Sequence, residues 1–206
     1  MTGLFVTFEG VDGVGKTTQA ALLERWLRGA GREVVRTREP GGTEVGERIR
    51  DIVLHHRGHV DPRAEALLYA ADRAHHVATV VRPALERGAV VIQDRYLDSS
   101  VAYQGAGRVL DPDDVRRLSL WAAEALLPDV TVLLDLDEAS ARRRLDADDK
   151  PFDRLEAEKA EFHARVRAAF LALADAEPAR FLVVDAAQPV ERIAEIVRAR
   201  VAEHLA

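Results

Sequence analysis

The hydrophobic positions along the chain follow two spacings, one typical of strands and one typical of helices. Short apolar runs rich in β-branched residues predict strands over residues 4–9, 33–36, 89–93, 130–136 and 181–184. Apolar residues at helical spacing predict helices over about 17–28, 62–87, 112–126 and 155–175, and from about 190 onward. Because the two kinds of segment alternate, the pattern predicts an α/β fold with a five-stranded parallel sheet flanked by helices.

Local signals mark the start of some of these helices. Asp61-Pro62 and Asp111-Pro112 each combine an N-cap carboxylate with a proline at the first helical position. A further helix is indicated by the helical spacing of Val45, Ile49, Ile52 and Val53. Functional residues of such layered folds lie where strands end and helices begin, so these junctions are where we expect the chemistry.

The amino-acid composition is typical of a globular protein and excludes some classes of binding partner. The 206 residues contain no repeat or low-complexity linker, so we expect one domain over residues 1–206. A formal net charge of −6 argues against binding to nucleic acid or to an anionic membrane. No apolar run is long enough for a membrane span, and strand-like alternation from Leu4 argues against a signal peptide. The absence of cysteine fits a reducing, cytoplasmic compartment.

The strongest motif lies directly after the first predicted strand and matches the pattern G-x-x-x-x-G-K-[ST] over residues 10–17. Glycines let the backbone curl so that successive N–H groups point at one phosphate, and the following helix adds its N-terminal dipole. Lys16 is expected to reach the β- and γ-phosphates and Thr17 to bind Mg²⁺. A chance glycine turn is the alternative. The candidate ATP-binding residues here are Gly10, Val11, Asp12, Gly13, Val14, Gly15, Lys16, Thr17 and Thr18.

This loop serves ATPases, GTPases and kinases alike, so it does not identify the reaction. GTPases read guanine through an N-K-x-D segment, and none of the three lysines stands in one. A large mechanical ATPase does not fit a chain of this length. The remaining residues therefore favour a kinase that acts on a small molecule.

The wider loop at residues 8–19 resembles that of thymidylate kinases, and further segments match the same family in the same order. These segments are Thr37–Thr43, Leu68–Arg73, Asp94–Tyr96, Ala102–Gly105, Asp153–Glu156 and Val184–Ala186. Together they extend over almost the whole chain. The bacterial form fits best, because Gly13 stands where eukaryotic relatives usually have arginine.

The resemblance implies transfer of the γ-phosphoryl group of ATP to dTMP, with Mg²⁺ as the cofactor. It also implies a P-loop NTP hydrolase-like nucleoside monophosphate kinase fold with a mobile lid, and a homodimer. The acceptor is a phosphate monoester with a second pKa of about 6, so it is mostly dianionic at neutral pH and needs no general base. Such an enzyme needs clustered cations and in-line alignment.

By the same resemblance, residues near the loop handle phosphate and metal. Arg95 clamps the phosphate of dTMP, a bidentate task that suits a guanidinium, although a surface ion pair is the alternative. Asp94 joins Thr17 in orienting Mg²⁺ or its waters. Asp12 accepts from the 3′-hydroxyl or faces the cations around the phosphates. Lys16, Arg95, Arg154 and Asp12 are the candidate catalytic residues.

A second set is implied to bind the nucleoside. Tyr69 stacks on thymine, unless it is simply core, and Arg73, one helical turn later, bonds a base carbonyl. Tyr103 presses against the sugar and favours deoxyribose. The other residues implied for this site are Ser100 and Gln104 as polar base contacts, Ile49 as an apolar floor, and Glu39.

The lid, at about residues 142–155, matches the family least well because it is longer and more acidic than usual. We expect Arg154 and one of three consecutive arginines to approach the γ-phosphate, with Arg142 assigned to ATP and Lys150 replacing a missing arginine. The alternative is that the triple arginine is a solvated helix face. His55, His59, His75 and His76 are expected to be solvated or core residues, not metal ligands.

Two other functions stay open. One is a kinase for another nucleotide or nucleoside, against which the segments around Tyr69 and Arg95 argue. The other is a nucleotide-binding regulator without catalysis, which the unusual lid favours and which intact Lys16, Thr17 and Arg95 argue against.

Overall fold

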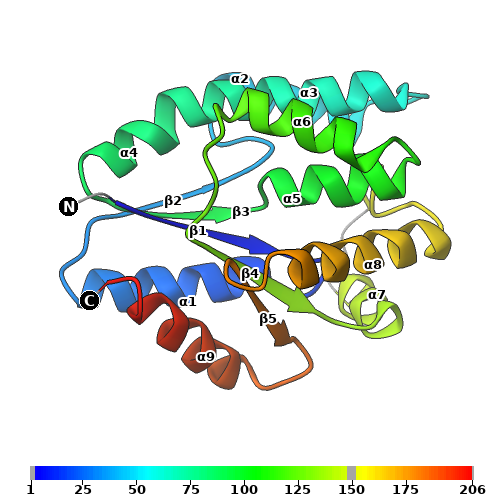
Figure 1. Ribbon diagram of the computed structural model, residues 1–206. Helices are drawn as coiled ribbons and strands as arrows, with labels where there is room; N and C mark the ends of the chain where they lie inside the picture. Colours follow the sequence, from blue (N-terminus) through cyan, green and yellow to red (C-terminus); the bar gives the residue numbers. More distant parts are fainter. Residues whose placement is uncertain (1–2, 148–151, 206) are drawn as a thin grey trace.

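The computed structural model describes residues 3–147 and 152–205. Five parallel strands form one sheet in the order β2-β3-β1-β4-β5 (Figure 1). The strands are β1 Leu4–Glu9, β2 Val34–Arg38, β3 Val90–Asp94, β4 Val130–Asp135 and β5 Phe181–Asp185. The predicted five-stranded parallel sheet is therefore confirmed, with strand ends shifted by a residue or two.

The sheet register aligns the strand ends that carry the site. Phe8 of β1 and Arg38 of β2 both pair with Asp94 of β3. The carboxyl ends of these three strands are thus level, and the segments that follow them leave the sheet side by side. This is the edge where a parallel α/β sheet places its ligands.

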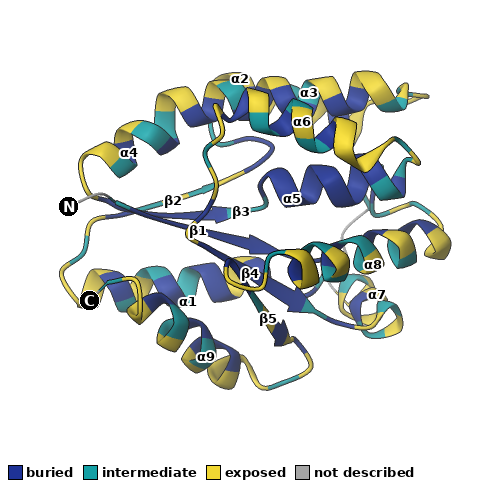
Figure 2. Ribbon diagram, viewed as in Figure 1, coloured by how far each residue is buried: buried dark blue, intermediate teal, exposed yellow. Residues whose placement is uncertain are grey.

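Helices cover both faces of the sheet. In Figure 1, α1 and α9 lie on one side, and α2 to α6 lie on the other. Figure 2 shows that the strands and the inward faces of the helices are buried and that the outer helix faces are exposed. The helices are α1 Lys16–Gly29, α2 Glu44–His55, α3 Pro62–His76, α4 Arg82–Glu86, α5 Leu97–Ser100, α6 Pro112–Ala122, α7 Glu138–Asp146, α8 Ala160–Ala176 and α9 Val190–Ala202, with π-helical stretches η1 Val77–Val81 and η2 Val101–Gly107.

Both predicted proline starts are confirmed. Asp61 caps α3 by accepting from two backbone N–H groups, and Asp111 does the same for α6. The helix predicted over 62–87 is α3, η1 and α4 end to end. Pro83 has no N–H to donate to the carbonyl four residues earlier, and the wider π-helical turn lies immediately before it. Among the described residues, none of the helices is long and apolar enough to cross a membrane.

Candidate active site

The segment after β1 is wrapped tightly around its own lysine. Gly10 has a φ of 129°, and a Cβ there would lie 2.4 Å from the carbonyl oxygen of Leu134 in β4. Gly15, with a φ of 98°, is the N-cap of α1. Lys16 Nζ donates to the carbonyl oxygens of Val11 at 2.8 Å and Gly10 at 3.1 Å. Only glycine adopts such conformations at no steric cost, which explains the motif.

A cleft of about 1370 Å³ opens over this loop. Residues Asp12 to Thr18 line it, whereas Gly10 and Val11 lie behind it and contribute carbonyl oxygens. The loop therefore carries the predicted ATP-binding residues into the cleft from Asp12 onward. The remaining walls come from β2, the β2–α2 segment, α2, the end of β3, α7, the segment before α8 and the residues after β5. They include Arg38, Glu39, Arg50, Asp94, Arg95, Arg144, Glu156, Ala186 and Gln188.

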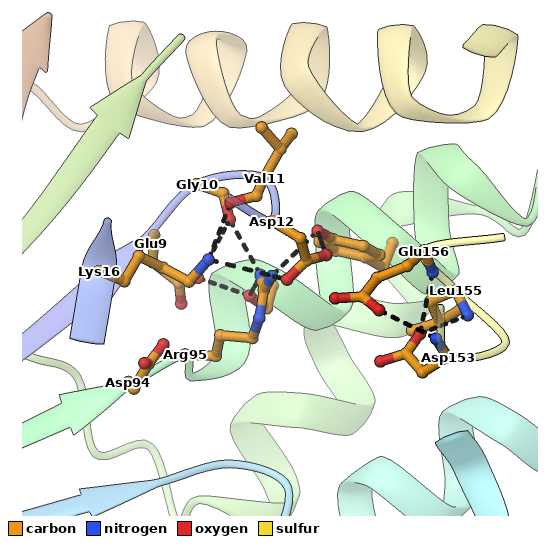
Figure 3. A network of polar contacts seen from close by, with 12 residues as sticks. Glu9, Gly10, Val11, Asp12, Lys16, Asp94, Arg95, Asp153, Leu155 and Glu156 are labelled. Atoms are coloured by element: carbon orange, nitrogen blue, oxygen red, sulfur yellow. Dashed lines mark hydrogen bonds and ion pairs between the residues drawn. The ribbon is translucent and has the colours of Figure 1, made fainter. Parts of the chain in front are cut away.

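Arg95 follows β3 directly and has a φ of 64°, in the left-handed region. Its Nη1 donates to Gly10 O at 3.0 Å and to Ser99 Oγ at 3.1 Å. Its Nη2 donates to Asp12 Oδ1 and, at 3.1 Å, to the Tyr103 hydroxyl. Figure 3 shows Arg95 and Lys16 converging on the loop carbonyls and on Asp12.

The negative charge of Asp12 lies between the positive charges of Arg95 and Lys16. Burial alone would raise the pKa of Asp12, but Arg95 and Lys16 outweigh it and hold that pKa well below its usual range. Burial, together with Arg95, lowers the pKa of Lys16. The Tyr103 hydroxyl donates to Asp12 Oδ2 at 3.0 Å. Asp12 therefore stays ionised and shields two cations from each other.

Glu9, the last residue of β1, is a buried carboxyl behind the loop. Its Oε1 accepts from the Tyr96 backbone N–H at 2.7 Å, and its Oε2 accepts from Ser99 Oγ at 2.5 Å. Burial and the neighbouring Asp98 raise the pKa of Glu9 to about 8. A neutral carboxylic acid therefore lies beneath the turn that presents Arg95.

Thr17 and Asp94 offer oxygen ligands at the cleft. The Thr17 hydroxyl donates to Asp94 Oδ2 at 2.9 Å, and both residues line the cleft beside Lys16. Hydroxyl and carboxylate oxygens are the hard donors that Mg²⁺ prefers, and Mg²⁺ usually keeps several waters and takes few protein ligands. The pair fits such an ion.

A second, smaller cavity of about 70 Å³ lies beyond Arg95. It contains most of the residues implied to bind the nucleoside: Glu39, Tyr69, Arg73, Arg95, Ser100, Tyr103 and Gln104. The Arg73 guanidinium donates three hydrogen bonds, each of 3.0 Å. Nε donates to Glu39, Nη1 to Ser119 and Nη2 to Ser100. A guanidinium has five N–H donors, so two remain.

Ile49 lies elsewhere than expected. It packs against the main core and is not among the residues that line the smaller cavity, where the apolar wall of α2 is Leu54. Arg50 lines both cavities and donates to Pro40 O at 3.0 Å. Arg50 and Leu54 are four residues apart and share a helix face, whereas Ile49 points about 100° away.

The arginines of α7 are also arranged differently from the expectation. Arg142 is exposed, pairs with Asp146 at 3.0 Å and stacks over Phe152, outside the residues that line the cleft. Arg144 lines the cleft and donates to Ala186 O at 2.9 Å. Two residues along a helix turn the side chain by about 200°, so only one of this pair faces the loop.

Arg154 is engaged away from the phosphate-binding loop. It donates to Val53 O at 2.9 Å and to the buried carboxylate of Glu65. Glu65 also accepts from Gln104 Nε2 at 2.9 Å. Arg154 therefore ties α2, α3 and η2 together in this arrangement. Lys150, the other lid cation singled out in the sequence, lies outside the described residues.

Two carboxylates of the segment before α8 are functional candidates that sequence reasoning missed. Asp153 lines the smaller cavity and Glu156 lines the cleft. They cap each other, because the Asp153 N–H donates to Glu156 Oε2 and the Glu156 N–H donates to Asp153 Oδ1, each at 2.9 Å. Figure 3 shows this pair across the site from Asp12. The D-x-x-E spacing was their signal in the sequence.

Comparison with known proteins gives the site its family. The family model "Thymidylate kinase" matches residues 8–197. The chain belongs to the thymidylate kinase family. A thymidylate kinase of Leifsonia xyli is 76% identical over 198 residues, covering 96% of this chain and 94% of that protein. Thymidylate kinases of Bifidobacterium longum and Deinococcus radiodurans are 58% and 51% identical, with at least 94% of each chain covered.

The match begins at Phe8, in β1, and ends at Val197, in α9, so it contains every cavity residue described above. The resemblance drawn from the motifs is thus confirmed at the level of the family. A thymidylate kinase is a kinase by name, and the two adjoining cavities match a reaction between two bound nucleotides.

Proposed function

We propose that this chain transfers the γ-phosphoryl group of Mg·ATP to dTMP, with ATP in the larger cleft and dTMP in the smaller cavity. The chain belongs to the thymidylate kinase family, and the proposal concerns which of its residues bind the two nucleotides and the metal ion. The observation that carries it is Arg95, which lines both cavities and bonds the phosphate-binding loop.

On the donor side, Lys16 and the loop N–H groups bind the phosphates. In the structure described, Lys16 is bonded to carbonyl oxygens of its own loop. ATP phosphates offer a more strongly charged acceptor, so Lys16 exchanges these carbonyls for phosphate oxygens. Arg144, beside Ala186, is the α7 arginine that we assign to ATP in place of Arg142.

On the acceptor side, Arg95 and Arg50 receive the phosphate of dTMP. Asp12 holds Arg95 in place until a phosphate takes its position on the guanidinium. The nucleoside then lies among Tyr69, Arg73 and Tyr103. Because the acceptor is already dianionic, catalysis consists of alignment and charge stabilisation, and no side chain has to remove a proton.

Thr17 and Asp94 would hold Mg²⁺ between loop and donor. When bound, the ion neutralises charge on the transferred phosphoryl group. In the structure described, Asp94 accepts a hydrogen bond from the Thr17 hydroxyl. This bond orients both oxygens toward the same point.

We also propose a homodimer. Large apolar side chains are exposed on helix α3 and on α2 and α6, which both pack against α3. They are Ile52 at 46%, Leu67 at 57% and Trp121 at 78% exposure. Leu67→Glu would convert a dimer seen by sedimentation velocity into a monomer, since burying a charge without a partner is costly. A wild-type monomer at micromolar concentration would refute the dimer. The cysteine-free composition supports a cytoplasmic location.

The function is tested by Mg·ATP-dependent ADP formation with dTMP, dUMP, UMP, dCMP, AMP, GMP and thymidine, using Lys16→Ala as the inactive control. We expect the highest kcat/KM for dTMP, a lower value for dUMP and none for thymidine. Arg95→Lys should lower kcat/KM for dTMP about 100-fold, because lysine cannot make a bidentate contact. Equal turnover of another monophosphate would refute the nucleoside assignment, and ATP binding without turnover would identify a regulator.

A further inference from the structure

The Arg73 guanidinium is held by a line of side chains that leads away from the acceptor cavity. Arg73 Nε donates to Glu39 Oε2 at 3.0 Å, and Glu39 Oε1 lies 2.9 Å from His76 Nδ1. His76 Nε2 lies 2.7 Å from Thr37 Oγ1. The line therefore runs from Thr37 in β2 through His76 in α3 to Glu39 after β2, and back to Arg73 in α3.

Hydrogen-bonding chemistry fixes the direction of the bond between His76 and Glu39. An ionised carboxylate only accepts, so His76 Nδ1 donates to Glu39. The contact between His76 Nε2 and the Thr37 hydroxyl can run in either direction, because a hydroxyl group both donates and accepts. Glu39 thus receives one donor on each oxygen, from His76 and from Arg73.

Burial leaves the His76 ring little freedom. Its side chain is fully buried, and it is absent from the described residues that line either cavity. A Cβ at Gly42 would lie 2.4 Å from His76 Nε2 and 2.5 Å from Thr37 Oγ1, so the β2–α2 segment closes directly on the pair. His76 reaches the smaller cavity through its hydrogen bond to Glu39, which lines that cavity.

We propose that His76 is a positioning residue for recognition of the nucleobase. By donating to Glu39 it fixes the carboxylate that orients Arg73, so that the two free N–H groups of Arg73 meet the base in one geometry. This inference rests on the proposed role of Arg73 in the nucleoside site. Without the hydrogen bond from His76, the Glu39 carboxylate can rotate. The plane of the Arg73 guanidinium is then no longer fixed.

The test compares two shape-related substitutions by steady-state kinetics. His76→Asn keeps an N–H donor near the position of Nδ1, and His76→Gln keeps a polar atom near Nε2 only. We expect His76→Gln to raise KM for dTMP about tenfold, the loss of one charge-assisted hydrogen bond, and His76→Asn to stay within about twofold. For both variants we expect unchanged kcat and unchanged KM for ATP. His75→Gln, on the exposed neighbour, is the matched control.

Arg73→Ala separates failure of this inference from failure of the proposed site. If Arg73→Ala leaves KM for dTMP unchanged, the assignment of Arg73 to the nucleoside is wrong. If Arg73→Ala raises KM and the two His76 variants behave alike, the positioning role is wrong. Should the His76 variants not fold, Thr37→Val removes the hydroxyl that contacts His76 Nε2, and we then expect a rise in KM for dTMP. An unchanged KM for dTMP would overturn the proposal.

Discussion

Arg95 holds a backbone conformation that residues with long side chains rarely adopt, and Glu9 is the residue that supports it. A strained φ persists where the surroundings over-determine it. Here the Glu9 carboxyl binds the N–H of Tyr96 and the hydroxyl of Ser99, and Ser99 in turn accepts from Arg95. The segment that carries Arg95 is therefore anchored at its backbone, and the guanidinium of Arg95 is anchored through Ser99.

Because the pKa of Glu9 is raised from 4.5 to about 8, stability should depend on pH. Between these values the folded protein keeps a proton that the unfolded chain has lost, so the free energy of unfolding falls as pH rises. Glu9→Gln removes this titration and should be more stable than wild type at pH 8 by about 4 kcal/mol. Urea unfolding from pH 5 to pH 9 measures both profiles.

The comparison at pH 5 serves as the internal control, because Glu9 is protonated in the folded protein there. Wild type and Glu9→Gln should then differ least at pH 5 and diverge toward pH 8. Parallel profiles across the whole range would mean that Glu9 is not neutral in the folded protein.

At the same scale, the sequence identified residues that directly follow a strand better than residues within a helix. Asp94 and Arg95 lie at the end of β3, and the structure places them beside Thr17 in the first turn of α1. Arg142 was chosen over Arg144, and the structure turns Arg144 to the cleft. The phase of α7 depends on where the helix begins, and a shift of one or two residues changes which arginine faces inward.

Among the elements, α3 carries Tyr69, Arg73 and His76, so its start matters for the site. Asp61 caps this helix, with Oδ1 accepting from Arg63 N at 2.9 Å and Ala64 N at 3.3 Å. Asp61→Ala should lower stability by about 1 kcal/mol, because two helix N–H groups lose their partner. Asp61→Asn keeps the acceptor oxygen and is the matched control. Equal melting temperatures for Asp61→Ala and wild type would contradict this reading.

The elements also show where periodicity is not informative. Residues 97–107 form α5 and η2, a helical stretch beside the smaller cavity that the periodicity does not predict. Its residues are buried on nearly all sides, so no polar face alternates with an apolar one. Small and polar residues such as Ser99, Ser100 and Gly105 further conceal the pattern.

In the molecule as a whole, one buried ion pair joins the far end of β5 to the site. Arg180, just before β5, donates to Asp98 of α5 at 2.7 Å and 2.9 Å, and to Thr131 of β4 at 2.7 Å. Arg180→Met should lower stability by about 3 kcal/mol or more, because it leaves the carboxylate of Asp98 buried without its partner. Chemical denaturation measures the loss.

The double variant Asp98→Leu with Arg180→Met is the control, since it removes both charges. It should recover most of the stability lost in Arg180→Met alone. Additive losses in the two single variants would show that the two side chains do not depend on each other.

The sequence predicted the class of sheet at this scale, and the order of its strands was left open. Five apolar runs alternating with helices require parallel pairing, which the structure confirms. Periodicity contains no information on which strands are neighbours, because that depends on where each crossover returns. The two adjoining cavities likewise depend on packing between distant segments, such as Arg95 and Asp153.

The central position of β1 has a consequence for how the chain folds during its synthesis. β1 is the first strand to be made, yet it pairs with β3 and β4, whose residues begin at Val90 and Val130. The loop after β1 therefore has no neighbouring strand until β3 has been translated at residues 90–94, and β1 gains its second neighbour only with β4, at residues 130–135. Contacts this distant along the chain close slowly, so any ligand of this loop should bind only after these long-range strand pairings have formed.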